Sequence, residues 1–135
     1  MEIVLTNQAA QRQRLLTALE AFTEEHHLPA SVRQAADLAL EEHLTNILRY
    51  AYDDTQLHEI RVRFELNQDG LVIEVEDDGR AFDPLQRPRV DTALPLESKP
   101  MGGLGIHLIR QVMDDVSYRR EANRNILRLH KRLKG

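Results

Sequence analysis

The chain has 135 residues, of which 41% are hydrophobic and 30% charged, and its net charge at pH 7 is −4. These values are typical of one globular domain with a buried core. The absence of cysteine excludes disulfides and thiolate metal sites, and the negative charge argues against nucleic-acid binding through bulk charge. No apolar run is long enough for a membrane span, and the first residues lack a secretion signal, so we expect a cytoplasmic protein.

The first half of the chain predicts a short strand and two helices. Residues 2–5 predict an edge strand, and apolar residues at helical spacing predict a helix over about 8–26, with Pro29 ending the segment. Ser31 and Gln34 have the spacing of a capping box, so a second helix is expected to begin at Ser31 and to end at about 50–52. Its predicted buried stripe consists of Val32, Ala36, Ala39, His43, Ile47 and Tyr50.

The second half changes to strand periodicity. Apolar residues alternate over 60–66 and 71–75 around a turn at 67–70, which predicts a hairpin. Residues 83–101 hold four of the five prolines, which is typical of a functional loop or lid. A helix is expected over about 104–113, followed by strands over 116–120 and 126–131 that turn at Asn123-Arg124. This order predicts a single α+β domain, a two-layer sandwich of three main helices on a mostly antiparallel sheet.

Basic residues are concentrated near the end of the chain. From Asp115 onward there are seven Lys or Arg residues and two acidic ones. One interpretation is the solvated face of the terminal strands, and the other is a docking surface for an acidic partner.

Glycines are concentrated at two places, Gly79 and the group Gly102, Gly103 and Gly105. The second group directly precedes a predicted helix, where unpaired backbone N–H groups and the helix dipole suit a phosphate. A plain tight turn explains the spacing equally well. The segment is neither a P-loop nor a dinucleotide fingerprint.

Polar side chains at the edge of the predicted core are a second indication of function. Glu42 and Asn46 are four residues apart on the long helix, at the border of its buried stripe, while Glu41 is expected to face solvent. A carboxylate and an amide placed there could bind a divalent cation and orient a nucleophile. A hydrogen bond on the helix surface is the alternative. The acidic pair Asp77-Asp78 then follows a predicted strand.

Together these segments resemble the Bergerat-type ATPase superfamily, which contains gyrase, the histidine kinases and the mismatch-repair ATPases. Residues 42–46 resemble its N box, Asp77-Asp78-Gly79 with Phe82 its G1 box, and Gly102-Gly103-Leu104-Gly105 its G2 box. Order and spacing agree, and 83–101 corresponds to the ATP lid. The short length and the phrases 45–46, 82–84 and 103–106 resemble the anti-sigma factor serine/threonine kinases in particular.

The resemblance implies a role for each matching residue. Asp77 accepts a hydrogen bond from the adenine amino group, Asn46 holds Mg²⁺, and Glu42 is the general base that deprotonates a serine or threonine hydroxyl. The remaining residues implied to contact the nucleotide are Gly79, Phe82, Gly102, Gly103, Leu104 and Gly105. Two positions depart from the pattern, because Ala81 replaces a second G1 glycine and Tyr50 replaces a histidine of several relatives.

The implied activity is ATP- and Mg²⁺-dependent phosphorylation of an anti-sigma antagonist, a single-domain protein. A sigma factor as a second partner and a homodimer are also implied, with no nucleic-acid or membrane partner. Two alternatives remain open. One is a regulator of the same fold that binds nucleotide and a partner without transferring phosphate, and the other is a detached catalytic domain of a histidine kinase.

Overall fold

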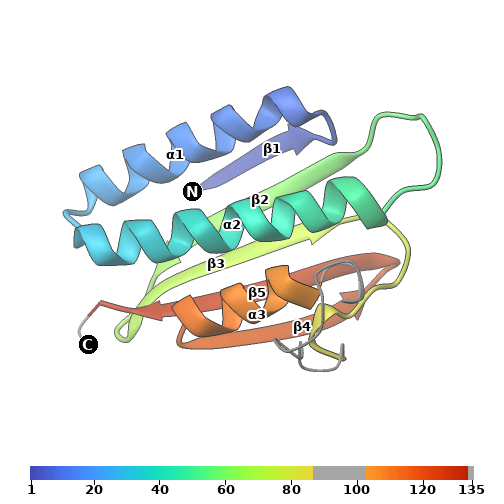
Figure 1. Ribbon diagram of the computed structural model, residues 1–135. Coiled ribbons are helices and arrows are strands. Elements are labelled where there is room, and N and C mark those ends of the chain that lie inside the picture. The colour runs from blue at the N-terminus through green and yellow to red at the C-terminus, as the bar shows by residue number, and fades with distance from the viewer. Residues whose placement is uncertain (87–102, 134–135) are drawn as a thin grey trace.

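Three helices cover one face of a five-stranded sheet in the computed structural model, which describes residues 1–86 and 103–133 (Figure 1). The elements are β1 (Glu2–Thr6), a 3₁₀ turn η1 (Ala9–Gln11), α1 (Arg12–Glu25), α2 (Ala30–Tyr50), β2 (Glu59–Leu66), β3 (Gly70–Asp77), η2 (Pro84–Gln86), α3 (Gly103–Val112), β4 (Asp115–Glu121) and β5 (Arg124–Arg132). The predicted α+β two-layer sandwich is confirmed. Most of the predicted lid, 83–101, lies outside the described residues.

Every pair of neighbouring strands is antiparallel, in the order β1-β2-β3-β5-β4. The helices are arranged so that α1 packs on β1, α2 crosses the middle of the sheet and α3 lies over β4 and β5 (Figure 1). The core fills the space between the layers, where the ring of Phe64 stacks on that of Phe22 at a centroid distance of 5.5 Å. Within the described ranges no helix is long and apolar enough to cross a membrane.

The start of α2 differs from the prediction. The helix begins at Ala30, one residue early, and no side chain caps it, so the capping-box interpretation of Ser31 and Gln34 is wrong. Pro29 precedes the helix with φ −59° and ψ 150°, and its carbonyl accepts the backbone N–H groups of Val32 and Arg33. The fixed φ of proline already suits a helix start, so the carbonyl of Pro29 opens the first turn and Ser31 falls inside it.

The turn between β4 and β5 also lies one residue from its predicted place. The loop consists of Ala122 and Asn123 rather than Asn123 and Arg124, and Glu121 pairs with Arg124 across it. Both loop residues have positive φ, 50° and 63°. A two-residue hairpin requires this conformation because its twist matches that of the flanking strands.

The open face of the sheet carries several of the basic residues of the C-terminal strands. Arg119 pairs with Glu74 at 3.0 Å and also with Glu121, and Arg124 lies 3.6 Å from Glu76. Arg63 joins Glu2 at 2.7 Å on the far side of the same face. Two of the seven basic residues from Asp115 onward, Arg119 and Arg124, therefore have acidic partners on this face, which fits the solvated-face interpretation for these two.

Candidate functional site

The site is built around Asp77, the last residue of β3. Its side chain is 3% exposed. Oδ1 accepts hydrogen bonds from the backbone N–H of Gly79 and from Asn125 Nδ2, both at 2.9 Å. Burial raises the pKa of this carboxyl above its ordinary value, and the two hydrogen bonds partly offset that effect. In the described part of the chain nothing donates to Oδ2, so one oxygen is held by the fold and the other is left for a ligand.

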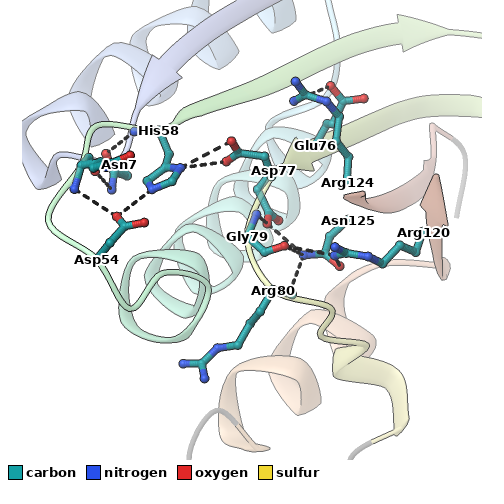
Figure 2. Close-up of polar contacts among 12 residues, drawn as sticks. Asn7, Asp54, His58, Glu76, Asp77, Gly79, Arg80, Arg120, Arg124 and Asn125 are labelled. Carbon is teal, nitrogen blue, oxygen red and sulfur yellow. Dashed lines mark hydrogen bonds and ion pairs between the residues drawn. The ribbon is translucent and has the colours of Figure 1, made fainter. Parts of the chain in front are cut away.

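Asn125 of β5 faces Asp77 directly in the strand register and is itself buried. Besides Asp77, its Nδ2 donates to the carbonyl of Arg80 at 2.8 Å, and its Oδ1 accepts from Arg120 Nη1 at 2.9 Å. Figure 2 shows this amide between the Gly79–Arg80 backbone and the guanidinium of Arg120. One side chain therefore links β3, β5 and the segment that leaves β3.

The segment after β3 is fastened to the end of α2. The backbone N–H of Arg80 donates to the carbonyl of Ala51 at 3.0 Å, and Arg80 Nε donates to the carbonyl of Tyr50 at 2.6 Å. A guanidinium at this place neutralises the negative end of the helix dipole. Position 79 requires glycine because the turn packs closely against the end of α2. A β carbon there would lie 2.5 Å from the β carbon of Ala51.

Two buried polar residues of α2 face the same region. Asn46 and His43 are each 6% exposed, and neither Asn46 Nδ2 nor His43 Nδ1 has a hydrogen-bond partner among residues 1–86 and 103–133. Burial lowers the pKa of His43 to about 4, so its ring is neutral at pH 7. Unpaired polar atoms inside a protein are costly, and here two of them lie in one pocket.

That pocket, called the β3 pocket below, opens between α2, the end of β3 and β5. It measures about 320 Å³ including its open mouth. The described residues that line it are His43, Asn46, Ile47, Ala51, Asp77, Phe82, Pro84, Tyr118, Asn125 and Leu127. Its walls are thus mainly apolar with a few buried polar groups, the composition typical of a small-molecule site.

The G2 glycines lie at the start of α3. This helix begins at Gly103, so Gly103, Leu104 and Gly105 form its first turn, whose backbone N–H groups have no partner within the helix. Gly102 lies outside the described residues. Figure 1 places this end of α3 at the same end of the molecule as the last turn of α2 and the segment after β3. Arg110 of α3 also donates to the carbonyl of Leu85 at 2.8 Å.

Glu42 lies one helical turn before Asn46 and is half-buried, but it is not among the described residues that line the β3 pocket. Glu41 is half-buried as well, rather than open to solvent as predicted. The physical reason is α1, because Arg12 reaches across that flank of α2 to donate to Thr45 Oγ1 at 3.0 Å. Of the departures from the family pattern, Ala81 is exposed and is likewise not a described lining residue.

The donor set fits a nucleotide that brings its own metal ion. The free oxygen of Asp77 suits an amino donor. The Nδ2 of Asn46, unpartnered among the described residues, can donate to a phosphate oxygen, and its side-chain oxygen can accept a cation. Within residues 1–86 and 103–133, no group of three or more His, Asp or Glu side chains is placed to hold a metal ion. Mg²⁺ in such sites takes few protein ligands and several phosphate and water oxygens, so a single side-chain oxygen such as that of Asn46 is compatible with such a site.

The comparison with protein families decides the assignment, because the model of the histidine kinase-like ATPase domain matches residues 5–131. The chain belongs to the histidine kinase-like ATPase domain family. The chain is 35% identical over 94 residues to the serine-protein kinase RsbW of Bacillus cereus. That match covers 67% of this chain and 58% of the relative.

Another curated protein and a solved structure are also similar to this chain. The serine-protein kinase RsbW of Oceanobacillus iheyensis is 34% identical over 84 residues, which are 58% of this chain and 52% of the relative. Each match thus spans less than two thirds of the curated relative. Among solved structures, the histidine kinase domain of the blue-light activated kinase from Erythrobacter litoralis superposes with a TM-score of 0.59 at 19% identity. The superposition covers 92% of this chain and 60% of the Erythrobacter chain. This likeness shows the fold.

Several residues of the site were not found from the sequence. Asn125 and Tyr118 lie in predicted strands, and nothing in a strand pattern distinguishes a polar residue that faces a pocket from one that faces water. The register of β3 against β5 is the missing information, since it sets Asn125 opposite Asp77. His43 was predicted to be a partly buried core residue. It is fully buried and also lines the β3 pocket.

Proposed function

We propose that this protein is an ATP-dependent serine/threonine protein kinase that acts as an anti-sigma regulatory factor and phosphorylates an anti-sigma antagonist. The observation that supports it best is the pairing of Asp77 and Asn46 in the β3 pocket. Each is buried, and each keeps a polar atom that no described residue engages. The name of the relatives, serine-protein kinase, supports a protein hydroxyl as the acceptor.

In this proposal the β3 pocket receives the adenine ring. Oδ2 of Asp77 accepts the exocyclic amino group, and Gly79 lets the turn after β3 pack directly against Ala51 beside the pocket. Phe82 and Leu127 supply apolar walls for the ring faces. The phosphates extend toward the first turn of α3, where Gly103, Leu104 and Gly105 offer backbone N–H groups, with Gly102 assigned to the same loop.

Asn46 and Glu42 divide the remaining work. Bound ATP supplies the γ-phosphoryl group, and Mg²⁺ neutralises charge on its phosphates. Asn46 would hold the metal through its side-chain oxygen. Glu42, one turn earlier on α2, accepts the proton of the attacking serine or threonine hydroxyl. The hydroxyl oxygen bonds to the γ-phosphorus while the bond from that phosphorus to the β–γ bridging oxygen breaks, and ADP leaves. Phosphoryl transfer depends mostly on positioning and charge stabilisation, so this short list of groups is enough.

The partners follow from the same reasoning. The substrate is a single-domain anti-sigma antagonist, a sigma factor is a second binding partner, and two copies of the chain form a homodimer in the cytoplasm. Nucleic acid and membrane are not partners in this scheme. The likeness to serine-protein kinases supports a protein substrate, and the ion pairs of Arg119 with Glu74 and of Arg124 with Glu76 favour no nucleic-acid partner. The antagonist, the sigma factor and the homodimer come from the family resemblance alone.

The deciding experiment compares Glu42→Gln with Glu41→Gln. Transfer from γ-labelled ATP to proteins of a native lysate is followed with Mg²⁺, and labelled sites are mapped. Glu42→Gln should retain ATP affinity because the amide has nearly the same size, while transfer falls by roughly 10²–10⁴-fold. Glu41→Gln, about 100° away around the helix, should keep most of the parent's transfer.

The outcomes separate the candidate functions. A parent that binds ATP and captures a partner but labels no serine or threonine is a binding regulator, which contradicts the kinase proposal. If Glu41→Gln loses transfer while Glu42→Gln does not, the general base has been assigned to the wrong carboxylate. A third variant, Asn46→Ala, should lose both Mg²⁺-dependent ATP affinity and transfer.

A further inference from the structure

Asn125 is a hydrogen-bond hub beside the proposed base site. Its Nδ2 faces acceptors, which are Asp77 Oδ1 at 2.9 Å and the carbonyls of Arg80 at 2.8 Å and Gly79 at 3.5 Å. Its Oδ1 faces donors, which are Arg120 Nη1, the hydroxyl of Tyr118 and the backbone N–H of Phe82 at 3.3 Å. Guanidinium and backbone N–H groups can only donate, so these partners fix which end of the amide is which.

The hub determines how the carboxylate of Asp77 is turned. The χ2 torsion of aspartate is broad and roughly two-fold, so the backbone alone does not select an oxygen for the pocket. Here Gly79 N–H and Asn125 Nδ2 both donate to Oδ1. The plane of the carboxylate is thereby set, and Oδ2 becomes the oxygen available to a ligand.

The same amide also fixes the chain that leaves the pocket. It binds the carbonyls of Gly79 and Arg80 and the N–H of Phe82, three of the four residues that follow Asp78. Phe82 lines the β3 pocket. A single side chain on β5 therefore holds both a polar recognition group and part of an apolar wall.

We propose that Asn125 is a positioning residue for nucleobase recognition, aiming Asp77 Oδ2 at the exocyclic amino group of a bound purine nucleotide. This inference rests on the proposed nucleotide site and adds its specificity. It concerns which base is bound and is independent of whether phosphate is transferred afterwards. A purely structural amide would support the fold and all nucleotides alike.

The test compares ATP with purine riboside triphosphate, which lacks only the 6-amino group. The parent should prefer ATP by roughly ten- to hundredfold, the usual worth of a hydrogen bond to a charged group. Asn125→Ala should lose most of that preference, because ATP affinity falls while affinity for the analogue changes little. Dissociation constants come from calorimetry, and the preference is their ratio.

A second variant keeps the test decisive if Asn125→Ala unfolds. Asn125→Asp has the same size and still accepts from Arg120 and Tyr118, but it sets a carboxylate oxygen against Asp77 Oδ1. Its preference for ATP should be lost at neutral pH and should return partly in acid, where the two carboxyls share a proton. Ile126→Ala is the matched control. Ile126 is the next residue of β5, is buried on the other face of the sheet, and does not line the β3 pocket, so destabilisation there should leave the preference intact.

Each outcome supports or overturns the inference. Loss of preference in both Asn125 variants, with the preference kept in Ile126→Ala, supports it. Equal loss of affinity for both nucleotides, or an unchanged ratio, makes Asn125 purely structural and overturns it. A parent that binds ATP and the analogue equally well contradicts the assignment of Asp77 and this inference together. A parent that prefers ATP but transfers no phosphate defeats only the kinase proposal.

Discussion

Gly79 and Ala51 touch so closely that the fold has no space for a side chain at position 79. A β carbon on Gly79 would lie 2.5 Å from the β carbon of Ala51 and 2.7 Å from its carbonyl oxygen. This contact joins the end of α2 to the turn that follows β3, and the hydrogen bond from the Arg80 N–H to the same carbonyl reinforces it. Two walls of the β3 pocket therefore meet at one glycine.

Gly79→Ala should accordingly damage both stability and binding. Overpacking of this kind costs about 1–3 kcal/mol, which a urea titration would detect, and ATP affinity should fall because α2 and the turn move apart. Ala51→Gly in the same chain removes the contact between β carbons but leaves the one with the carbonyl oxygen, so rescue should be partial. If Gly79→Ala alone were as stable as the parent, the turn after β3 would be able to move away from Ala51 at no cost, which would contradict this prediction.

Asp77→Asn should separate stability from recognition. The asparagine oxygen can still accept from Gly79 and Asn125, while its NH₂ group replaces the oxygen that faces the pocket. ATP affinity should fall roughly ten- to hundredfold in calorimetry. Because burial raises the folded-state pKa of Asp77, the charged carboxylate opposes folding at pH 7. The variant should therefore be at least as stable as the parent, and a large loss of stability would contradict this account.

His58 should make stability depend on pH near neutrality. Nε2 lies 2.8 Å from Asp54 (Figure 2), and Nδ1 lies 3.2 Å from Asp78. Only the doubly protonated ring can therefore donate to both carboxylates. The hydrogen bond to Asp54 is the main cause that raises the pKa of His58. Its stabilising effect is present below about pH 6.5, the unfolded value, and is lost as pH rises through the folded pKa.

The measurement compares urea midpoints of the parent and His58→Gln across pH 6 to 9. The parent's advantage should be largest at pH 6 and should shrink with rising pH. Buried His43 acts in the opposite sense, since its lowered pKa makes stability rise between about pH 4 and 6.5, but it is common to both proteins and cancels. His26→Gln, an exposed control, should follow the parent. If the difference in urea midpoint between the parent and His58→Gln did not change with pH, His58 would not bridge Asp54 and Asp78 as a charged group.

Ala122→Asn should stabilise the protein. Ala122 occupies φ 50° in the β4–β5 turn, where a β carbon costs about 1–2 kcal/mol that asparagine partly avoids through local hydrogen bonds. Because the residue is exposed, no packing changes, and the free energy of unfolding should rise by about 0.5–1 kcal/mol. Ala122→Val, with a branched side chain in the same conformation, should lower it, and the opposite order would contradict the turn assignment.

Periodicity predicted the elements that make the fold. The alternation over 60–66 and 71–75 and the stripe on α2 from Val32 to Ile47 depend on local spacing, and each is present in the structure. The predicted boundaries are wrong where one contact in the structure outweighs the preference of the local sequence. The carbonyl of Pro29 starts α2 in place of a side-chain cap, and hairpin twist moves the β4–β5 turn to Ala122.

The site was predictable only in part. Asp77, Gly79 and Asn46 stand in short motifs, and the structure brings Asp77 and Asn46 into one pocket. Asn125 has no motif of its own and gains its role from strand register, which involves residues 48 positions apart. Glu41 was expected to be solvent-exposed because one helix considered alone does not reveal its neighbour, and α1 covers that flank.

The antiparallel sheet keeps the β2–β3 turn far from the chemistry. Asp77 is at one end of β3 and this turn is at the other, so eight residues of strand separate them by about 27 Å. Gly70 is locked there, because a β carbon would meet the carbonyl of Lys131 at 2.2 Å, but Asp69 beside it is exposed. Since the chain has no cysteine, Asp69→Cys would create a unique thiol. A surface tether attached there would hold the protein and leave the mouth of the β3 pocket uncovered.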